Sequence, residues 1–235
     1  MVIVLDRSGS METGRSDHEG GLRSFVRDQR ALAGDVRLTF VRFDSHDPFE
    51  LVYDGVLLTD VDDDKLSLLP RGGTPLYDAL GRTLTHVNAR LGKLQEQPDQ
   101  VVVMIITDGQ ENSSTEFTKA LVKSLVEARE KSGWKVLYLG ANVDEFVEGS
   151  ALGVAKGASL GYGVSSQAIG AAYASISNNM AAARSMIQTT GVSATVGEAG
   201  AEQIYSNYMF TKKQRESAKP KDETTQNTTN ESKTS

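Results

Sequence analysis

The chain has 235 residues, of which 39% are hydrophobic and 24% charged, with a formal net charge of −6. A chain of that length can bury a substantial core. The negative net charge argues against a general nucleic-acid binder. The absence of cysteine excludes disulfides, thiolate metal ligands and a cysteine nucleophile. No apolar run approaches the ~18 residues of a membrane helix, and Met1 leads straight into an apolar run with no secretory leader, so we expect a cytoplasmic protein with no membrane partner.

Apolar runs and helical spacings alternate along the first part of the chain. A continuous apolar run at 2–5 predicts a strand that is buried on both faces of a parallel sheet. A helix is predicted over 21–32 and a strand over 36–43. The segment 49–56 follows closely and predicts an antiparallel edge partner, and a long apolar stripe predicts a helix over 76–94.

The alternation continues with the most apolar strand, at 101–107, which is therefore expected at the centre of the sheet. An amphipathic helix follows over 116–131, and then a strand over 135–139. The inward face of that helix is predicted to carry Leu121, Leu125 and Ala128. Strands that alternate with helices indicate an α/β fold with a parallel sheet and right-handed crossovers.

The composition changes after residue 150, which predicts three parts. Residues 1–150 form the main domain, and residues 151–210 form a Gly/Ala-rich segment with an accessory helix packed on or beside that domain. Apolar side chains recur at steps of three and four between 169 and 187, which fits a docked helix better than a partner-binding helix. Residues 211–235 contain no large apolar side chain, so a disordered polar tail is expected.

Five oxygen-bearing side chains stand at loops that follow strands or precede a helix. Asp6 and Asp108 each follow a predicted strand, so both stand at the edge of the sheet where open α/β sheets bind ligands. Ser8 and Ser10 can project their hydroxyls from one side of their loop, and Thr74 lies in a Gly-Gly-Thr-Pro turn before a helix. Two carboxylates and three hydroxyls favour Mg2+ or Mn2+ over Ca2+, which takes roughly six to eight oxygens.

Each of these short segments also has a plainer interpretation. Asp108-Gly109 is a common turn dipeptide. The segment 6–10 could be a loop that leads into a helix, and the segment 72–75 could be an ordinary turn. The acidic residues at 60–64 fit a solvated helix start better than a second cation site. The histidines form no metal or triad pattern and are expected on the surface or in loops: His18, His46 and His86.

The three segments together are more specific than any one alone. Asp-x-Ser-x-Ser at 6–10, Gly-Gly-Thr-Pro-Leu at 72–76 and Thr-Asp-Gly at 107–109 resemble the metal-ion-dependent adhesion site of von Willebrand factor A domains. The resemblance spans about residues 1–150 and is nearest to intracellular bacterial or phage members. It implies a Rossmann-like three-layer α/β/α sandwich, whose central sheet is mostly parallel with one antiparallel edge strand.

The resemblance also implies a role for each residue of the site. Ser8, Ser10 and Thr74 would supply hydroxyl ligands, while Asp6 and Asp108 would coordinate the cation directly or through water. A carboxylate from an Asp or Glu of a bound protein would complete the coordination shell. Such domains usually bind proteins and catalyse nothing, so we expect a protein partner, no nucleic acid and no enzymatic activity.

Two alternatives remain from the sequence. The first is a subunit that recruits clients to an AAA+ ATPase, resembling the A-domain components of chelatase or MoxR-type systems. The second is a metal-dependent phosphoester hydrolase. An aspartyl phosphatase would need a second Asp two residues after the first, as general acid, and Ser8 stands there instead.

Overall fold

A single six-stranded sheet forms the centre of the molecule. The computed structural model describes residues 1–141, 145–191 and 200–219. The strands are β1 (Val2–Asp6), β2 (Arg37–Asp44), β3 (Asp47–Leu57), β4 (Val102–Thr107), β5 (Lys135–Ala141) and β6 (Ser159–Tyr162). They lie in the order β3-β2-β1-β4-β5-β6, and only β3 runs antiparallel to its neighbour. The predicted mostly parallel sheet with one antiparallel edge strand is confirmed.

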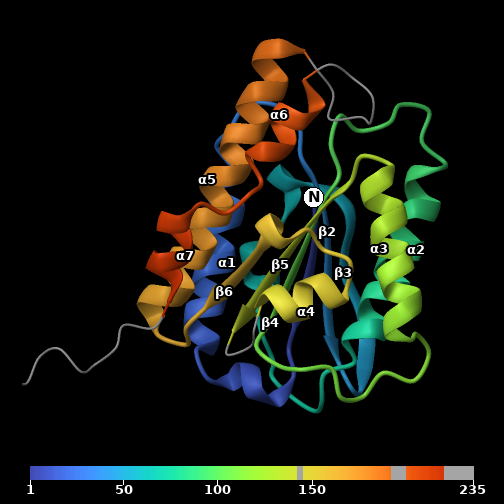
Figure 1. Ribbon diagram of the computed structural model, residues 1–235, viewed down its shortest axis with the longest axis vertical. Coiled ribbons are helices and arrows are strands. Elements are labelled where there is room, and N and C mark those ends of the chain that lie inside the picture. The colour runs from blue at the N-terminus through green and yellow to red at the C-terminus, as the bar shows by residue number, and fades with distance from the viewer. Residues whose placement is uncertain (142–144, 192–199, 220–235) are drawn as a thin grey trace, which may run out of the picture.

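Helices cover both faces of this sheet, which gives the predicted three-layer sandwich (Figure 1). On one face lie α1 (Arg15–Arg30) and α5 (Ser166–Thr190), and on the other lie α2 (Leu76–Leu91) and α3 (Lys119–Lys131). The shorter helices are α4 (Glu145–Ala151), α6 (Ala201–Ser206) and α7 (Lys212–Ala218). Within the described ranges, no helix combines the length and the apolar character needed to cross a bilayer.

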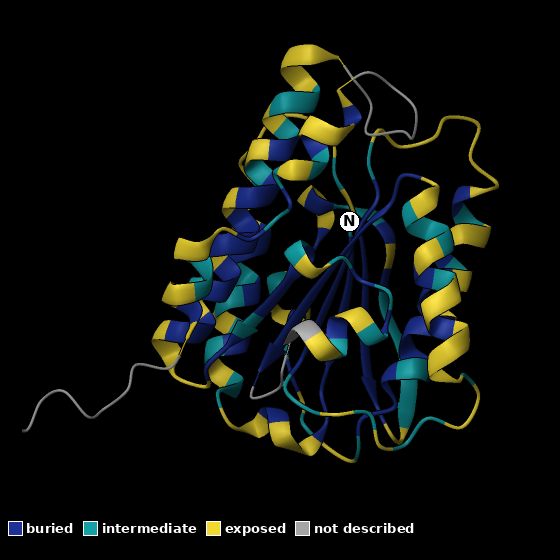
Figure 2. Cartoon of the chain, viewed as in Figure 1, coloured by how far each residue is buried: buried dark blue, intermediate teal, exposed yellow. Residues whose placement is uncertain are grey.

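The central strands are apolar because both of their faces are covered. Every residue of β1 and of β4 is buried (Figure 2). The two strands pair in parallel, with Val4 opposite Ile105. Continuous apolar runs of this length are typical of a parallel sheet between two helical layers.

Helix α1 begins at Arg15, six residues before the predicted start at 21. Two adjacent glycines, Gly20 and Gly21, obscure the helical pattern in the sequence. Gly21 faces α5, and a β-carbon there would overlap the ring of Tyr173. Glycine at this position therefore allows α1 and α5 to approach closely, which outweighs its low helix propensity.

Of the predicted inward face of α3, Leu125 is partly buried against the core, but the prediction for Leu121 is wrong. Leu121 is 47% exposed, whereas Val122 and Val126 are buried. The helix begins later than the pattern predicted, at Lys119, because the side chain of Thr118 caps it by accepting a hydrogen bond from the backbone N–H of Leu121. Apolar residues stand at both 121 and 122, so the sequence alone did not distinguish the two possible faces.

The region after residue 150 contributes to the sheet itself. Residues 159–162, within the segment assigned to an accessory role, form the edge strand β6, in which Leu160 pairs with Leu139 of β5. The predicted docked helix is α5, which packs against α1. In the predicted polar tail, residues 212–218 form α7, which begins with a capping box of Thr211 and Gln214. Residues 220–235 lie outside the described part of the chain.

Candidate metal site

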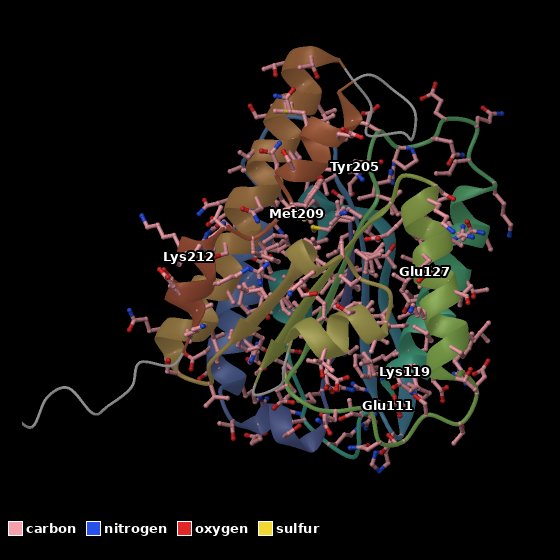
Figure 3. All side chains as sticks on the ribbon, viewed as in Figure 1. Glu111, Lys119, Glu127, Tyr205, Met209 and Lys212 are labelled. Atoms are coloured by element: carbon pink, nitrogen blue, oxygen red, sulfur yellow. The ribbon has the colours of Figure 1, made fainter. Side chains whose placement is uncertain are left out.

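The candidate site lies where the order of the strands reverses. Asp6 is the last residue of β1, and Asp108 directly follows β4. From β1 the sheet extends through β2 on one side and through β4 on the other, which makes this edge the topological switch point. The loops that follow both strands lie at the lower end of the sheet, where Glu111 is labelled (Figure 3).

Hydrogen bonds join the three polar residues of the β1 loop to Asp108. The backbone N–H of Ser8 donates to Asp6 Oδ1 at 2.7 Å. The Ser8 and Ser10 hydroxyl oxygens are 3.1 Å apart, and the Ser10 hydroxyl donates to Asp108 Oδ1 at 2.7 Å. Asp6 is fully buried, and its Oδ2 accepts a hydrogen bond from the Thr107 hydroxyl at 2.6 Å.

Thr74 reaches the same place from the loop before α2. A β-carbon added to Gly109 would lie 3.3 Å from Thr74 Oγ1 and 3.5 Å from Ser10 Oγ. Both hydroxyls therefore lie close to the same position beside Gly109. Asn112 holds Thr74 there: its Oδ1 accepts from the Thr74 N–H at 2.8 Å, and its own N–H donates to the Thr74 carbonyl at 3.1 Å. The structure thus brings the predicted residues of all three segments together.

The oxygen atoms fit a small hard cation. Neighbouring ligands of an octahedral Mg2+ lie about 2.9 Å apart, given metal–oxygen distances of about 2.0–2.1 Å. The Ser8–Ser10 and Ser10–Asp108 oxygen separations, 3.1 and 2.7 Å, bracket that value. Across the described ranges no three His, Cys, Asp or Glu side chains gather as a metal site. Binding here would therefore depend on hydroxyl ligands as well as on the two carboxylates.

The electrostatics of the site also favour a cation. Burial raises the pKa of Asp6 from 3.8 to about 6, and the nearby charge of Asp108 adds to the shift, while hydrogen bonds from Thr107 and Ser8 oppose it. Burial likewise raises the pKa of Asp108, against a hydrogen bond from Ser10. A divalent cation between the two carboxylates would stabilise the ionised form of each.

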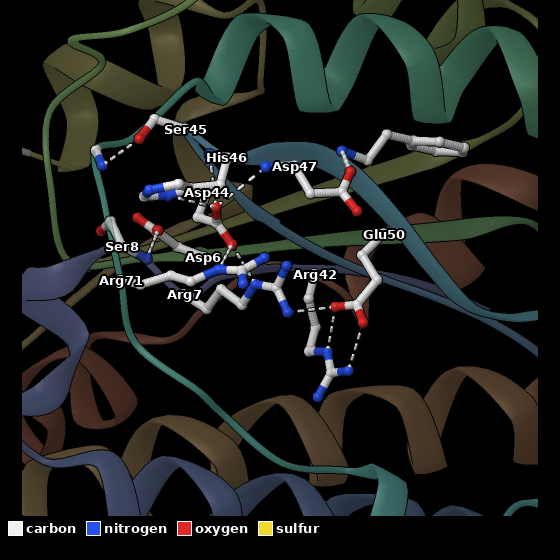
Figure 4. Close-up of polar contacts among 12 residues, drawn as sticks. Asp6, Arg7, Ser8, Arg42, Asp44, Ser45, His46, Asp47, Glu50 and Arg71 are labelled. Atoms are coloured by element: carbon white, nitrogen blue, oxygen red, sulfur yellow. Dashed lines mark hydrogen bonds and ion pairs between the residues drawn. The ribbon is translucent and has the colours of Figure 1, made fainter.

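A buried ion-pair cluster beside the site was missed by sequence reasoning (Figure 4). Asp44, at the end of β2, is fully buried and accepts from Arg7 Nε at 2.5 Å, Arg71 Nε at 3.0 Å and the His46 N–H at 2.7 Å. Burial alone would raise the pKa of Asp44, but these hydrogen bonds hold it below its usual value. Arg7 also pairs with Glu50. The sequence signal was Asp44 at the end of a predicted strand, without an indication of its partners.

Backbone hydrogen bonds join the same loops. The Gly9 N–H donates to the Gly72 carbonyl at 3.0 Å, and the Arg71 N–H donates to the Arg7 carbonyl at 2.8 Å. Gly72 has a φ of 66°, and a β-carbon there would collide with Ser45. Glycine is therefore needed at this turn, which holds the loop of Thr74 against the loop of Ser8 and Ser10.

Two further acidic residues, Glu111 and Asp78, order the third loop. Glu111 accepts from the backbone N–H groups of Ser113, Ser114 and Tyr77 at 2.9, 2.7 and 3.0 Å. Asp78, in the first turn of α2, accepts from three successive N–H groups at 115–117. Each carboxylate thus satisfies backbone donors of the other segment, which fixes the approach to Thr74.

The prediction for the histidines was wrong for His18, which is only 2% exposed. It lies on the inward face of α1, four residues before Leu22, and its Nδ1 is 3.3 Å from the Tyr173 hydroxyl. His46 is exposed and His86 is partly exposed, as expected. The interpretation of 60–64 as a helix start fits, because Asp62 caps a short 3-10 helix there.

Comparison with known proteins finds likeness in structure alone. No known family model matches the chain. No curated protein matches it either. Among solved structures, proximal thread matrix protein 1 from the mussel byssus is 15% identical, with a TM-score of 0.56 over 75% of this chain and 46% of that one.

Two other similar solved structures are named as von Willebrand factor domains. A von Willebrand factor type A protein from Catenulispora acidiphila is 18% identical, with a TM-score of 0.51 over 75% of this chain and 41% of that one. The vWF domain of the type V pili tip protein Mfa5 from Porphyromonas gingivalis is 13% identical, with a TM-score of 0.50 over 84% of this chain and 96% of that one. This chain spans less than half of the mussel and Catenulispora chains. It has the Rossmann-like α/β fold of von Willebrand factor A domains.

Proposed function

We propose that the chain is a divalent-cation-dependent protein-binding module. In this proposal Asp6, Ser8, Ser10, Thr74 and Asp108 hold Mg2+ or Mn2+, and an Asp or Glu of a partner protein completes the coordination shell. The observation that carries the proposal is the meeting of oxygen atoms from three loops, shown by the 2.7 Å bond from Ser10 to Asp108 and by the position of Thr74 beside Gly109.

The burial of the five residues gives the site an open side. Asp6, Ser8 and Thr74 are buried, whereas Ser10 is exposed and Asp108 partly exposed. A bound cation would supply a Lewis-acidic centre that attracts a carboxylate. The partner would approach past Ser10 and Asp108, while the buried residues hold the inner side of the site in place.

The same residues support binding rather than catalysis. Ser8 occupies the position where an aspartyl phosphatase carries its general acid, and its hydroxyl contacts Ser10. A serine hydroxyl does not protonate a leaving group near neutral pH. Recruitment of clients to an AAA+ ATPase would use this same binding step, so the two hypotheses differ in the identity of the partner.

The proposal is tested by capture on the immobilised full chain, in Mg2+ and in EDTA. We expect a defined set of proteins to be retained in Mg2+ and released by EDTA, and Asp108→Ala to retain none of them. Asp60→Asn, which changes an exposed aspartate in a short 3-10 helix elsewhere in the chain, serves as the control and retains the full set. Capture that survives both EDTA and Asp108→Ala overturns the proposal. An AAA+ ATPase among the retained proteins would decide for recruitment, and Mg2+-dependent turnover of p-nitrophenyl phosphate would decide for hydrolysis.

A further inference from the structure

The ion-pair cluster beside the candidate site contains more positive than negative charge. Its members are Arg7, Arg42, Arg71, Asp44 and Glu50 (Figure 4). Arg7 contacts both carboxylates, Arg42 pairs with Glu50 at 2.9 Å, and Arg71 pairs with Asp44 at 3.0 Å. Three arginines and two carboxylates leave one net positive charge.

That surplus charge faces solvent at Arg71. Arg7 and Arg42 are buried, whereas the Arg71 side chain is 50% exposed. Only Nε of Arg71 is bonded, to Asp44, and its two terminal amino groups have no partner among the residues that the structure describes. Arg7 Nη2 is also buried without a partner there, so the cluster lacks acceptors rather than donors.

Asp44 has three hydrogen-bond donors besides Arg71. It already accepts from Arg7 Nε at 2.5 Å and from the backbone N–H groups of His46 and Asp47 at 2.7 and 3.1 Å. The bond to Asp44 holds Nε of this half-exposed guanidinium and leaves the two terminal amino groups available as donors. An arginine held in this way loses little side-chain entropy when it binds a planar anion.

Arg71 also lies next to the residues proposed to bind the cation. Its backbone N–H bonds the carbonyl of Arg7, which follows Asp6, and the carbonyl of the next residue, Gly72, accepts from Gly9 between the two serines. Thr74 is three residues further along the same loop. A chain that delivers one carboxylate to the cation therefore passes close to Arg71.

We propose that Arg71 determines specificity by binding a second carboxylate of the partner. This inference rests on the proposed function: one acidic side chain completes the cation shell, and a nearby one in the same segment pairs with the Arg71 guanidinium. The site would then prefer a segment with two acidic residues over one with a lone Asp or Glu. Charge-assisted bonds from arginine to carboxylate are the stronger kind of hydrogen bond, which gives the second contact measurable weight.

The test uses fluorescent Gly/Ser peptides that carry either one Asp or two Asp residues separated by zero to three positions. Anisotropy titrations in Mg2+ compare the full chain with Arg71→Gln, Arg71→Lys and a control, Arg82→Gln. Arg82 is matched to Arg71 because its side chain is 41% exposed and also pairs with a carboxylate. That carboxylate belongs to Glu116, in the loop that precedes α3.

We expect the best two-Asp peptide to bind the unaltered chain about two- to fivefold more tightly than the one-Asp peptide, because the second pair is charge-assisted but its guanidinium is half exposed to solvent. Arg71→Gln should remove this preference and leave one-Asp binding unchanged. Arg71→Lys, which keeps the charge but loses the planar fork, should retain part of it. Arg82→Gln should retain all of it.

The remaining outcomes separate the two proposals. If no peptide binds in a Mg2+-dependent manner, the proposed function fails, and this inference fails with it. If one-Asp and two-Asp peptides bind equally well, or if Arg71→Gln weakens both alike, only the inference is overturned. Melting curves and Mg2+ titrations accompany each variant. A loss of Mg2+ affinity in Arg71→Gln would make Arg71 a residue that positions the site, and would also overturn the inference.

If Arg71→Gln does not fold, Arg71→Lys and the peptide preference of the unaltered chain decide the outcome.

Discussion

The Ser10 hydroxyl donates a 2.7 Å hydrogen bond to Asp108, a residue 98 positions away in the chain. This bond joins the loop after β1 to the loop after β4, the two neighbouring strands at which the order of the sheet reverses. The contact places one hydroxyl and one carboxylate at the open side of the candidate site. Both residues can therefore be altered with little effect on the buried side.

Replacing Asp108 by Asn should separate the metal response from the stability of the fold. Asp108 and the buried Asp6 repel each other, so the variant without metal should melt at the same temperature as the unaltered chain or at a higher one. Its Mg2+ affinity should fall at least about tenfold, because a charged ligand is lost. Calorimetry and melting curves with and without Mg2+ measure both effects. An undiminished Mg2+-induced rise in melting temperature would contradict the prediction.

Mg2+ affinity should depend on pH through Asp6. Because the pKa of Asp6 is raised from 3.8 to about 6, a proton competes with the cation as the pH falls through that value. Affinity should then fall by up to about tenfold per pH unit below the pKa. Titrations in buffers of different ionisation enthalpy should also show proton release on binding near this pKa. Affinity that stays constant from about pH 7.5 to about pH 5 would rule out this role for Asp6.

Stability should fall with acidification because of His18. Burial lowers the pKa of His18 from 6.5 to about 4, so the unfolded chain binds a proton that the folded chain refuses between these values. The contribution is present above about pH 6.5 and is lost as the pH falls toward 4, by up to about 3 kcal/mol. Asp6 acts in the opposite sense over part of this range. The comparison of urea unfolding between the unaltered chain and His18→Gln isolates the histidine, and identical pH slopes would refute the prediction.

Removal of the Asp44 carboxylate should be costly. Asp44→Ala leaves the buried Arg7 with one carboxylate partner, Glu50, in place of two, and breaking a buried pair on one side costs up to about 3–5 kcal/mol. The matched control is Glu116→Ala, which removes the exposed partner of Arg82 and should cost no more than about 1 kcal/mol. Both free energies come from urea denaturation. Equal costs for the two variants would show that the buried cluster contributes no more than a surface pair.

Two neighbouring glycines of α1 should respond in opposite ways to alanine. Gly21→Ala would push a methyl group into the ring of Tyr173 and should destabilise the fold by about 1–3 kcal/mol. Nothing lies within 4 Å of the position where Gly20 would carry a β-carbon, so Gly20→Ala should stabilise α1 by up to about 1 kcal/mol. Thermal unfolding of both variants measures this difference. The same sign of effect at both positions would contradict the packing between α1 and α5.

The strands and the meeting of the site loops could be predicted because they depend on local patterns. Apolar runs at 2–5 and 101–107 indicate strands buried on both faces, and parallel strands bring the residues at their carboxyl ends, Asp6 and Asp108, to one edge. That metal binds there stays a prediction, as does residence in the cytoplasm.

The rest depends on contacts that no local pattern contains. Arg7, Asp44 and Arg71 are distant in sequence, and each is compatible with an exposed loop until the three loops meet. The strand β6 has only four residues and includes a glycine, so it lacks a recognisable period. His18 is buried because α5 covers α1, which the sequence of α1 does not reveal.

The edge strand β6 determines where a fragment of this chain could end and still fold. A fragment that stops at residue 150 would leave the hydrogen-bonding groups of β5 without their neighbour and would uncover the side of α1 that α5 occupies. An exposed strand edge next to an apolar helix face promotes self-association. Fragments intended for crystallisation or for peptide display should therefore extend at least through Lys219, so that α5 and α7 are retained.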